Sequence, residues 1–127
     1  MAKRRSQLDH DKMVKKIAYM LVKEGYEDVK AAHISNYPEP EEIDYPDYDE
    51  PHIPDVTGYK DYFELYEVET KDSIIEFHTE DQWSLFSTYC EENGAIFIIA
   101  VPAGYEDLAD ERLLELSIQA KVIGVSQ

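Results

Sequence analysis

The hydrophobic and polar positions along the chain follow distinct periods, and each period predicts a different element. Apolar residues three or four positions apart predict an amino-terminal helix that ends at Gly25. A continuous apolar run, AIFIIAVP, predicts a strand in the middle of a sheet that is covered on both faces. The predicted elements, in chain order, are a helix at 7–24, a strand at 26–34, an irregular loop at 35–54, strands at 55–59 and 61–70, a helix at 79–92, a strand at 95–102, a helix at 105–116 and a strand at 120–125.

Local signals place the boundaries between these elements. The stretch 35–54 holds five of the six prolines and seven acidic residues, and proline removes the hydrogen bonds that a strand or helix interior needs. Gly58 to Asp61 predicts the turn of a hairpin, Thr79 predicts a helix N-cap, and Asn93-Gly94 predicts the end of that helix. The pattern predicts one α/β domain over residues 1–127, with a mixed sheet flanked by helices and an acidic, Pro- and Tyr-rich loop inserted at about 36–53.

Composition narrows the class of protein. A chain of 127 residues is long enough to bury a core without disulfides, and the single cysteine, Cys90, rules out an internal disulfide. The longest apolar run is too short to cross a bilayer, and the basic start of the chain is not followed by an apolar stretch of the kind found in secretory signals. We therefore expect a soluble, cytoplasmic protein that does not interact with membranes.

The net charge of −16 is unevenly distributed. Residues 1–30 carry eight Lys or Arg against five Asp or Glu, whereas residues 31–81 carry two against sixteen. The acidic excess argues against a protein that simply coats nucleic acid, but the amino-terminal helix is basic enough to meet a phosphate backbone. Its basic residues are Lys3, Arg4, Arg5, Lys12, Lys15 and Lys16.

The strand at 61–70 places two carboxylates where apolar residues are expected. Alternation puts Glu67 and Glu69 on the same face as Phe63 and Leu65. A carboxylate that points into a core is costly unless it is paired or binds a metal. Asp55, at the start of the neighbouring strand, can converge with Glu67 on one divalent ion. The other interpretation is that Glu67 and Glu69 face solvent on a half-exposed sheet.

These residues and the order of elements resemble the PD-(D/E)xK nuclease superfamily, which includes restriction-type endonucleases and Holliday junction resolvases. The matching motifs are Pro54-Asp55 and Glu67-Val68-Glu69, followed by a helix that carries Gln82 and by the apolar strand. The resemblance implies a restriction endonuclease-like core of helix, three strands, helix and strand. It also implies Mg²⁺ or Mn²⁺ held by Asp55, Glu67, Glu69 and the backbone carbonyl of Val68, and a catalytic role for Gln82.

One position departs from the family pattern. The third motif residue is usually Lys, but this chain has Glu69, which could act as a general base or bind a second metal. Lys71 or Lys60 could replace the missing positive charge. Residues 82–86, Gln-Trp-Ser-Leu-Phe, resemble the QxxxY pattern of recombination nucleases with Phe in place of Tyr, although Gln82 could instead only support the cap at Thr79. The amino-terminal helix offers Asp9 and Asp11 as further acidic ligands.

The leading function is metal-dependent hydrolysis of DNA phosphodiester bonds, with Asp55, Glu67, Glu69, Lys71 and Gln82 as catalytic residues. The alternative is a nuclease-fold protein without activity that binds nucleic acid or protein. DNA is the expected partner, bound through the basic amino-terminal helix. The sequence also leaves open a homodimer, a basic protein partner for the acidic loop, and an acidic mimic of DNA.

Overall fold

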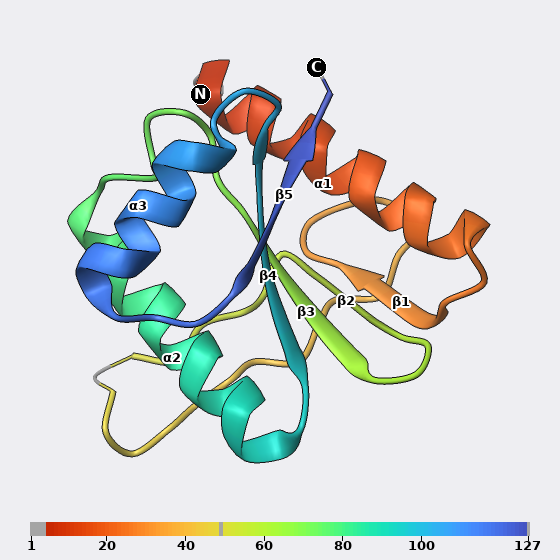
Figure 1. The fold of residues 1–127 in the computed structure, drawn as a ribbon. Helices are drawn as coiled ribbons and strands as arrows, with labels where there is room; N and C mark the ends of the chain where they lie inside the picture. Colours follow the sequence, from red (N-terminus) through yellow and green to blue (C-terminus); the bar gives the residue numbers. More distant parts are fainter. Residues whose placement is uncertain (1–4, 49, 127) are drawn as a thin grey trace.

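The computed structural model describes residues 5–48 and 50–126, with the backbone alone at Arg5, Ser6, Phe77 and His78. Two of the basic residues expected to face phosphate, Lys3 and Arg4, lie outside the described residues. The elements are α1 (Arg5–Lys23), β1 (Glu27–Ala31), β2 (Val56–Tyr59), β3 (Phe63–Val68), α2 (Phe77–Asn93), β4 (Ile96–Pro102), α3 (Glu106–Leu116) and β5 (Lys121–Val125) (Figure 1). No helix in the described part of the chain is long and apolar enough to cross a membrane.

The strands form one open sheet in the order β1-β2-β3-β4-β5. The first three strands form an antiparallel meander, whereas β3, β4 and β5 run parallel to one another. The chain reaches each new parallel strand through a helix, first α2 and then α3, because parallel neighbours need a crossover connection. The prediction of an α/β fold with a mixed sheet flanked by helices is confirmed.

The helices cover both faces of the sheet (Figure 1). The buried side of α1 packs on one face and α2 and α3 pack on the other, so the protein has two hydrophobic clusters. β4 lies between β3 and β5 and is buried from Phe97 to Val101, as its continuous apolar run predicts. The first cluster includes Val14, Ile17, Leu21, Val56, Tyr66 and Val68, and the second includes Leu65, Trp83, Phe86, Phe97, Ile99 and Leu113.

The strands predicted at 26–34 and 61–70 are shorter than expected, Glu27–Ala31 and Phe63–Val68, and two predicted boundary signals are wrong. Gly58 is not in the hairpin turn but in β2, paired with Glu64, and the turn lies at 60–62. A Cβ at Gly58 would stand 3.4 Å from Leu21 and from Tyr26, which is the edge of ordinary van der Waals contact, so the site has room for little more than a small residue. Thr79 is not the N-cap of α2, because the helix begins two residues earlier and the Thr79 hydroxyl donates to the Ser73 carbonyl at 2.7 Å.

The acidic loop at 35–54 is irregular, as predicted, but it is fixed to α2. An isolated antiparallel bridge joins Ile43 to His52, and Ile43 is buried. The Tyr48 hydroxyl lies 2.8 Å from the Ser84 hydroxyl of α2, and Tyr45 packs edge-on against Tyr89. The loop therefore lies against α2 and brings its last residues to the start of β2.

Candidate acidic site where β2 begins and β3 ends

Glu67 and Glu69 are buried on the α2 face of the sheet, as the strand alternation predicts. Leu65, two residues before Glu67, belongs to the hydrophobic cluster beneath α2 and α3. Glu67 and Glu69 are each only 5% exposed. The interpretation that these carboxylates face solvent is therefore wrong.

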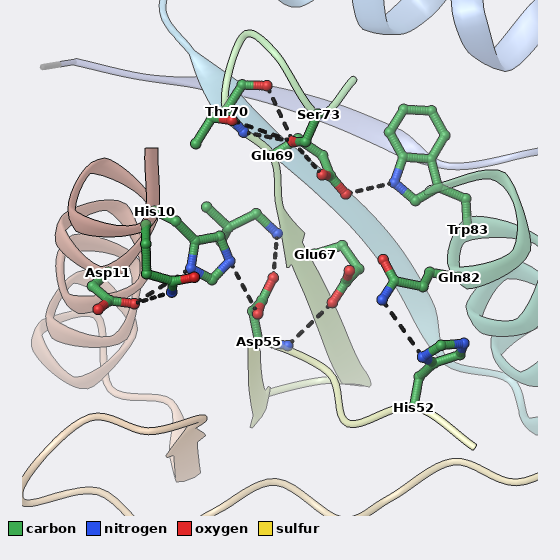
Figure 2. Close-up of polar contacts among 12 residues, drawn as sticks. His10, Asp11, His52, Asp55, Glu67, Glu69, Thr70, Ser73, Gln82 and Trp83 are labelled. Atoms are coloured by element: carbon green, nitrogen blue, oxygen red, sulfur yellow. Dashed lines mark hydrogen bonds and ion pairs between the residues drawn. The ribbon is translucent and has the colours of Figure 1, made fainter. Parts of the chain in front are cut away.

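Asp55 is joined to Glu67 and to the strand that carries it. Because Val56 pairs with Tyr66, Asp55 lies opposite Glu67 across the β2–β3 ladder. The Asp55 amide donates to Glu67 Oε1 at 3.3 Å, and the Val68 amide donates to Asp55 Oδ2 at 2.8 Å (Figure 2). The two acids expected to converge on one ion thus lie side by side.

His10 of α1 is a site residue that the sequence reasoning missed. Its Nε2 lies 3.2 Å from Asp55 Oδ1, and its Nδ1 lies 3.5 Å from Asp11 Oδ1. The signal that could have identified His10 is its helical spacing from Met13, Val14 and Ile17, which puts it on the buried side of α1. Asp11, one of the two acids proposed as a further ligand, therefore contacts His10, which in turn contacts Asp55.

Glu69 turns away from this pair and is held by two donors. The Ser73 hydroxyl donates to Glu69 Oε1 at 2.6 Å, and the Trp83 indole donates to Glu69 Oε2 at 2.9 Å. Ser73 lies in the turn between β3 and α2, and Trp83 is fully buried in the second turn of α2. Glu69 therefore ties the end of β3 to α2 (Figure 2).

Gln82 and His52 lie on the other side of Glu67 from Asp55 (Figure 2). Gln82 Nε2 lies 3.5 Å from His52 Nδ1, and the Gln82 amide turns toward Glu67. The interpretation of Gln82 as support for a cap at Thr79 is wrong, because Thr79 does not cap the helix. Gln82 instead comes to the acidic site from α2, while His52 comes from the end of the loop.

The buried acids have shifted pKa values. Burial raises the pKa of Glu67 well above its usual range, and the charges of Asp55 and Glu69 raise it further. Burial also raises the pKa of Glu69 to about 7, although its bonds from Ser73 and Trp83 partly oppose the rise. Burial lowers the pKa of His10, but the bond to Asp55 and the charge of Asp55 outweigh it, so the pKa is raised to about 9. The raised pKa favours the imidazolium form of His10 beside Asp55 at neutral pH.

The donors at this site fit a hard divalent ion only in part. Carboxylate oxygens from Asp55 and Glu67 suit Mg²⁺ or Mn²⁺, which proteins often hold with one or two carboxylates while water fills the other positions. Within residues 5–48 and 50–126, no group of three or more His, Cys, Asp or Glu side chains is placed to hold a metal ion. Asp55 and Glu67 therefore suit the ion as two ligands. Glu69 could become a third ligand only if its carboxylate left Ser73 and Trp83.

The lysines expected to supply positive charge lie elsewhere. β3 ends at Val68, so the expectation that Lys71 continues the strand face is wrong, and Lys71 is exposed in the following turn. Lys60 donates to the Glu24 carbonyl and stands over the Tyr26 ring, at the hairpin end of β2. Lys12, Lys15 and Lys16 are exposed on α1, and Lys16 bonds to Ser126.

Comparison with protein-family models, with curated proteins and with solved structures finds no match for this chain.

Proposed function

We propose that this protein is a restriction endonuclease-like nuclease that hydrolyses DNA phosphodiester bonds with Mg²⁺ or Mn²⁺. The observation that carries the proposal is the pair Asp55 and Glu67, brought together where β2 begins and β3 ends, with Glu67 buried and Asp55 partly buried beside His10. The chain order of helix, three strands, helix and strand, with β4 parallel to β3, also agrees with the core that the superfamily resemblance implies.

The proposed ligands are one oxygen each from Asp55 and Glu67 and the backbone carbonyl of Val68. A divalent ion bound there would polarise the phosphate and make a bound water more acidic. The protein's own contribution is to hold the two carboxylates in place. The Val68 amide fixes one oxygen of Asp55, and His10 holds the other. Gln82, which turns toward Glu67, would orient the water or the phosphate through its amide.

Glu69 takes the place of the usual Lys, and we assign it the role of general base. A base with a pKa near the working pH combines the correct protonation state with a useful affinity for the proton. The pKa of about 7 for Glu69 meets this condition. Ser73 and Trp83 hold its carboxylate away from Asp55 and Glu67, so this role requires Glu69 to leave these donors and turn toward the pair when metal and substrate bind. Lys71 has no part in this mechanism, because it is exposed in the turn.

A binding protein without nuclease activity is the second candidate, and a specific observation favours it. Glu69 already has two donors and Asp55 already has an imidazolium partner, so most of the polar network is satisfied by the chain itself. A network satisfied in this way can serve as a purely structural element. DNA, or a basic protein bound by the acidic loop at 35–54, would then be the partner.

Cleavage of DNA separates the two candidates. Purified protein is incubated with plasmid, branched and single-stranded DNA in Mg²⁺, in Mn²⁺ or in a chelator. Asp55→Asn and Glu67→Gln should abolish cleavage, because each removes a ligand for the ion that stabilises the transition state. Glu64→Gln is the matched control, since it changes a carboxylate on the opposite face of the same strand. DNA cleavage that persists in Glu67→Gln would contradict the proposal, and folded wild type that cuts no substrate would favour the binding protein.

A further inference from the structure

The solvent-facing side of α1 carries more exposed apolar side chains than is usual for a helix in contact with water. Leu8, Tyr19 and Val22 are 48%, 64% and 52% exposed, although the opposite side of the helix is fully buried. Exposed lysines lie between them at spacings of three and four residues, so all of these residues share one side of the helix. We call this surface the α1 outer face, and it consists of Leu8, Lys12, Lys15, Tyr19, Val22 and Lys23.

The outer side of α3 has the opposite charge and its own apolar centre. Leu114 is 80% exposed, and exposed acids stand one and two turns before it on the same side of the helix. The buried side of α3, with Ala109 and Leu113, faces the sheet. We call this surface the α3 outer face, and it consists of Asp107, Asp110, Glu111 and Leu114.

The two faces complement each other but cannot meet within one molecule. α1 packs on one face of the sheet and α3 packs on the other, so their outer faces point in opposite directions (Figure 1). We propose that the α1 outer face of one molecule docks on the α3 outer face of a second copy. This contact is independent of the acidic site, because neither face includes Asp55, Glu67 or Glu69.

Charge and apolar surface together favour this partner over a bare phosphate backbone. Lysines alone would suit a polyanion, but Leu8, Tyr19 and Val22 need an apolar surface to cover them. Leu114 offers such a surface next to exposed acids. The ring of Tyr19 can therefore pack on Leu114 while the lysines of α1 pair with the acids of α3. The two surfaces differ, so the contact is heterologous, and each added copy leaves one face of each kind free.

The net charge of −16 opposes association of identical copies, but it does so mainly over long distances. At an ionic strength of about 0.15 M the Debye length is about 8 Å. Repulsion between the distant acidic parts of two molecules is then largely screened, whereas lysines and acids in direct contact still attract. Measurements in this range of salt are therefore the ones that reveal the contact.

A charge exchange between the two helices tests the proposal. Analytical ultracentrifugation over a wide range of protein concentration is expected to show reversible self-association of the wild type. Lys15→Glu with Lys23→Glu, or Asp110→Lys with Glu111→Lys, should each weaken it by about tenfold or more, because attraction becomes repulsion. Lys71→Glu with Lys121→Glu is the matched control for the α1 variant, since it lowers the net charge of the protein by the same amount at two exposed lysines outside both helices.

Mixing the two helix variants gives the sharpest result. Each variant alone has two faces of like charge, whereas a mixture pairs a basic face with an acidic one in both directions and should associate again. A single chain with all four substitutions keeps the native net charge and should also associate. Circular dichroism confirms that each variant is folded. A monomeric wild type, an equal loss in the control, or a failure of the mixture to associate would overturn the proposal, as would an oligonucleotide bound by the α1 lysines of a monomer.

Discussion

Glu67 is the residue whose surroundings are hardest to explain by stability alone. It is 5% exposed, and the donor described for it is the Asp55 amide at 3.3 Å, while Asp55 and Glu69 add negative charge nearby. A buried carboxylate in such a place is either protonated or balanced by a cation. Burial of this kind is common where function requires a shifted pKa, and it is the physical reason for placing the candidate site here.

The stability of the folded protein should decrease with rising pH because of the raised pKa values of Glu69 and His10. The pKa of Glu69 is raised to about 7 and that of His10 to about 9, so the folded protein binds more protons than the unfolded chain between about pH 4.5 and 9. The free energy of unfolding of the metal-free protein should therefore fall as pH rises through this window. Glu69 accounts for a decrease on the order of 3 kcal/mol in the free energy of unfolding between about pH 4.5 and 7. Urea denaturation in a chelator at several pH values measures it.

The variant Glu69→Gln shows how much of the pH dependence of stability is due to Glu69. It removes a titrating group and keeps the size of the side chain, so the slope of stability against pH should become shallower below about pH 7, while the parts due to Glu67 and His10 remain. An unchanged slope in Glu69→Gln would show that the pKa of Glu69 is not raised.

The sequence predicts some of these residues and not others for a definite reason. Strand alternation is local, so the burial of Glu67 and Glu69 could be predicted from their spacing to Leu65. The contact between His10 and Asp55 joins residues far apart in the chain, and no local pattern specifies it. The partners of Glu69 also depend on how α2 crosses the sheet, which explains why its bonds to Ser73 and Trp83 were not predicted.

At the scale of elements, the connection between β3 and α2 is the one that shapes the site. Ser73 in the turn accepts from Thr79 of α2 through its carbonyl and donates to Glu69 through its hydroxyl. This internal bonding replaces an N-cap, because Glu76 makes no capping bond with its side chain. Thr79 does make a polar bond near the start of α2, as its sequence position suggests, but it does so from within the helix and not as the N-cap.

Trp83→Phe tests whether this connection is structural. The change removes the indole donor and leaves the buried Glu69 carboxylate with one donor fewer, so the free energy of unfolding should fall by about 1–3 kcal/mol at neutral pH. Denaturation followed by circular dichroism measures it. A double-mutant cycle with Glu69→Gln isolates the bond, and additive effects of the two changes would show that the indole and the carboxylate are not coupled.

The elements themselves were largely predictable. Periodicity predicts α1, β4, α3 and β5 because each has an uninterrupted pattern of one period. Gly94, with φ of 65°, ends α2 in the left-handed conformation that Asn93-Gly94 predicts. Gly58 was misplaced because a glycine in a strand and a glycine in a turn look alike in the sequence, and the pairing with Glu64 in the β2–β3 ladder is what distinguishes them.

At the scale of the whole molecule, the charge is separated between the two sides of the sheet. The basic residues of α1 lie on one side, whereas α3 and residues 43–48 of the acidic loop lie with α2 on the other. A partner surface with negative charge, such as the α3 outer face of a second copy, would therefore be attracted to the α1 side.

The central claim is that Asp55 and Glu67 form a divalent-ion site, and a titration of Mn²⁺ followed by thermal unfolding tests it most directly. Bound ion stabilises the folded state, so the midpoint temperature of the wild type should rise once the concentration of Mn²⁺ passes the dissociation constant. Glu64→Gln should respond as the wild type does, because its carboxylate is bonded to Tyr26 and Tyr66 on the other face. The account predicts no such rise in Glu67→Gln. Equal rises in Glu67→Gln and in wild type would contradict it.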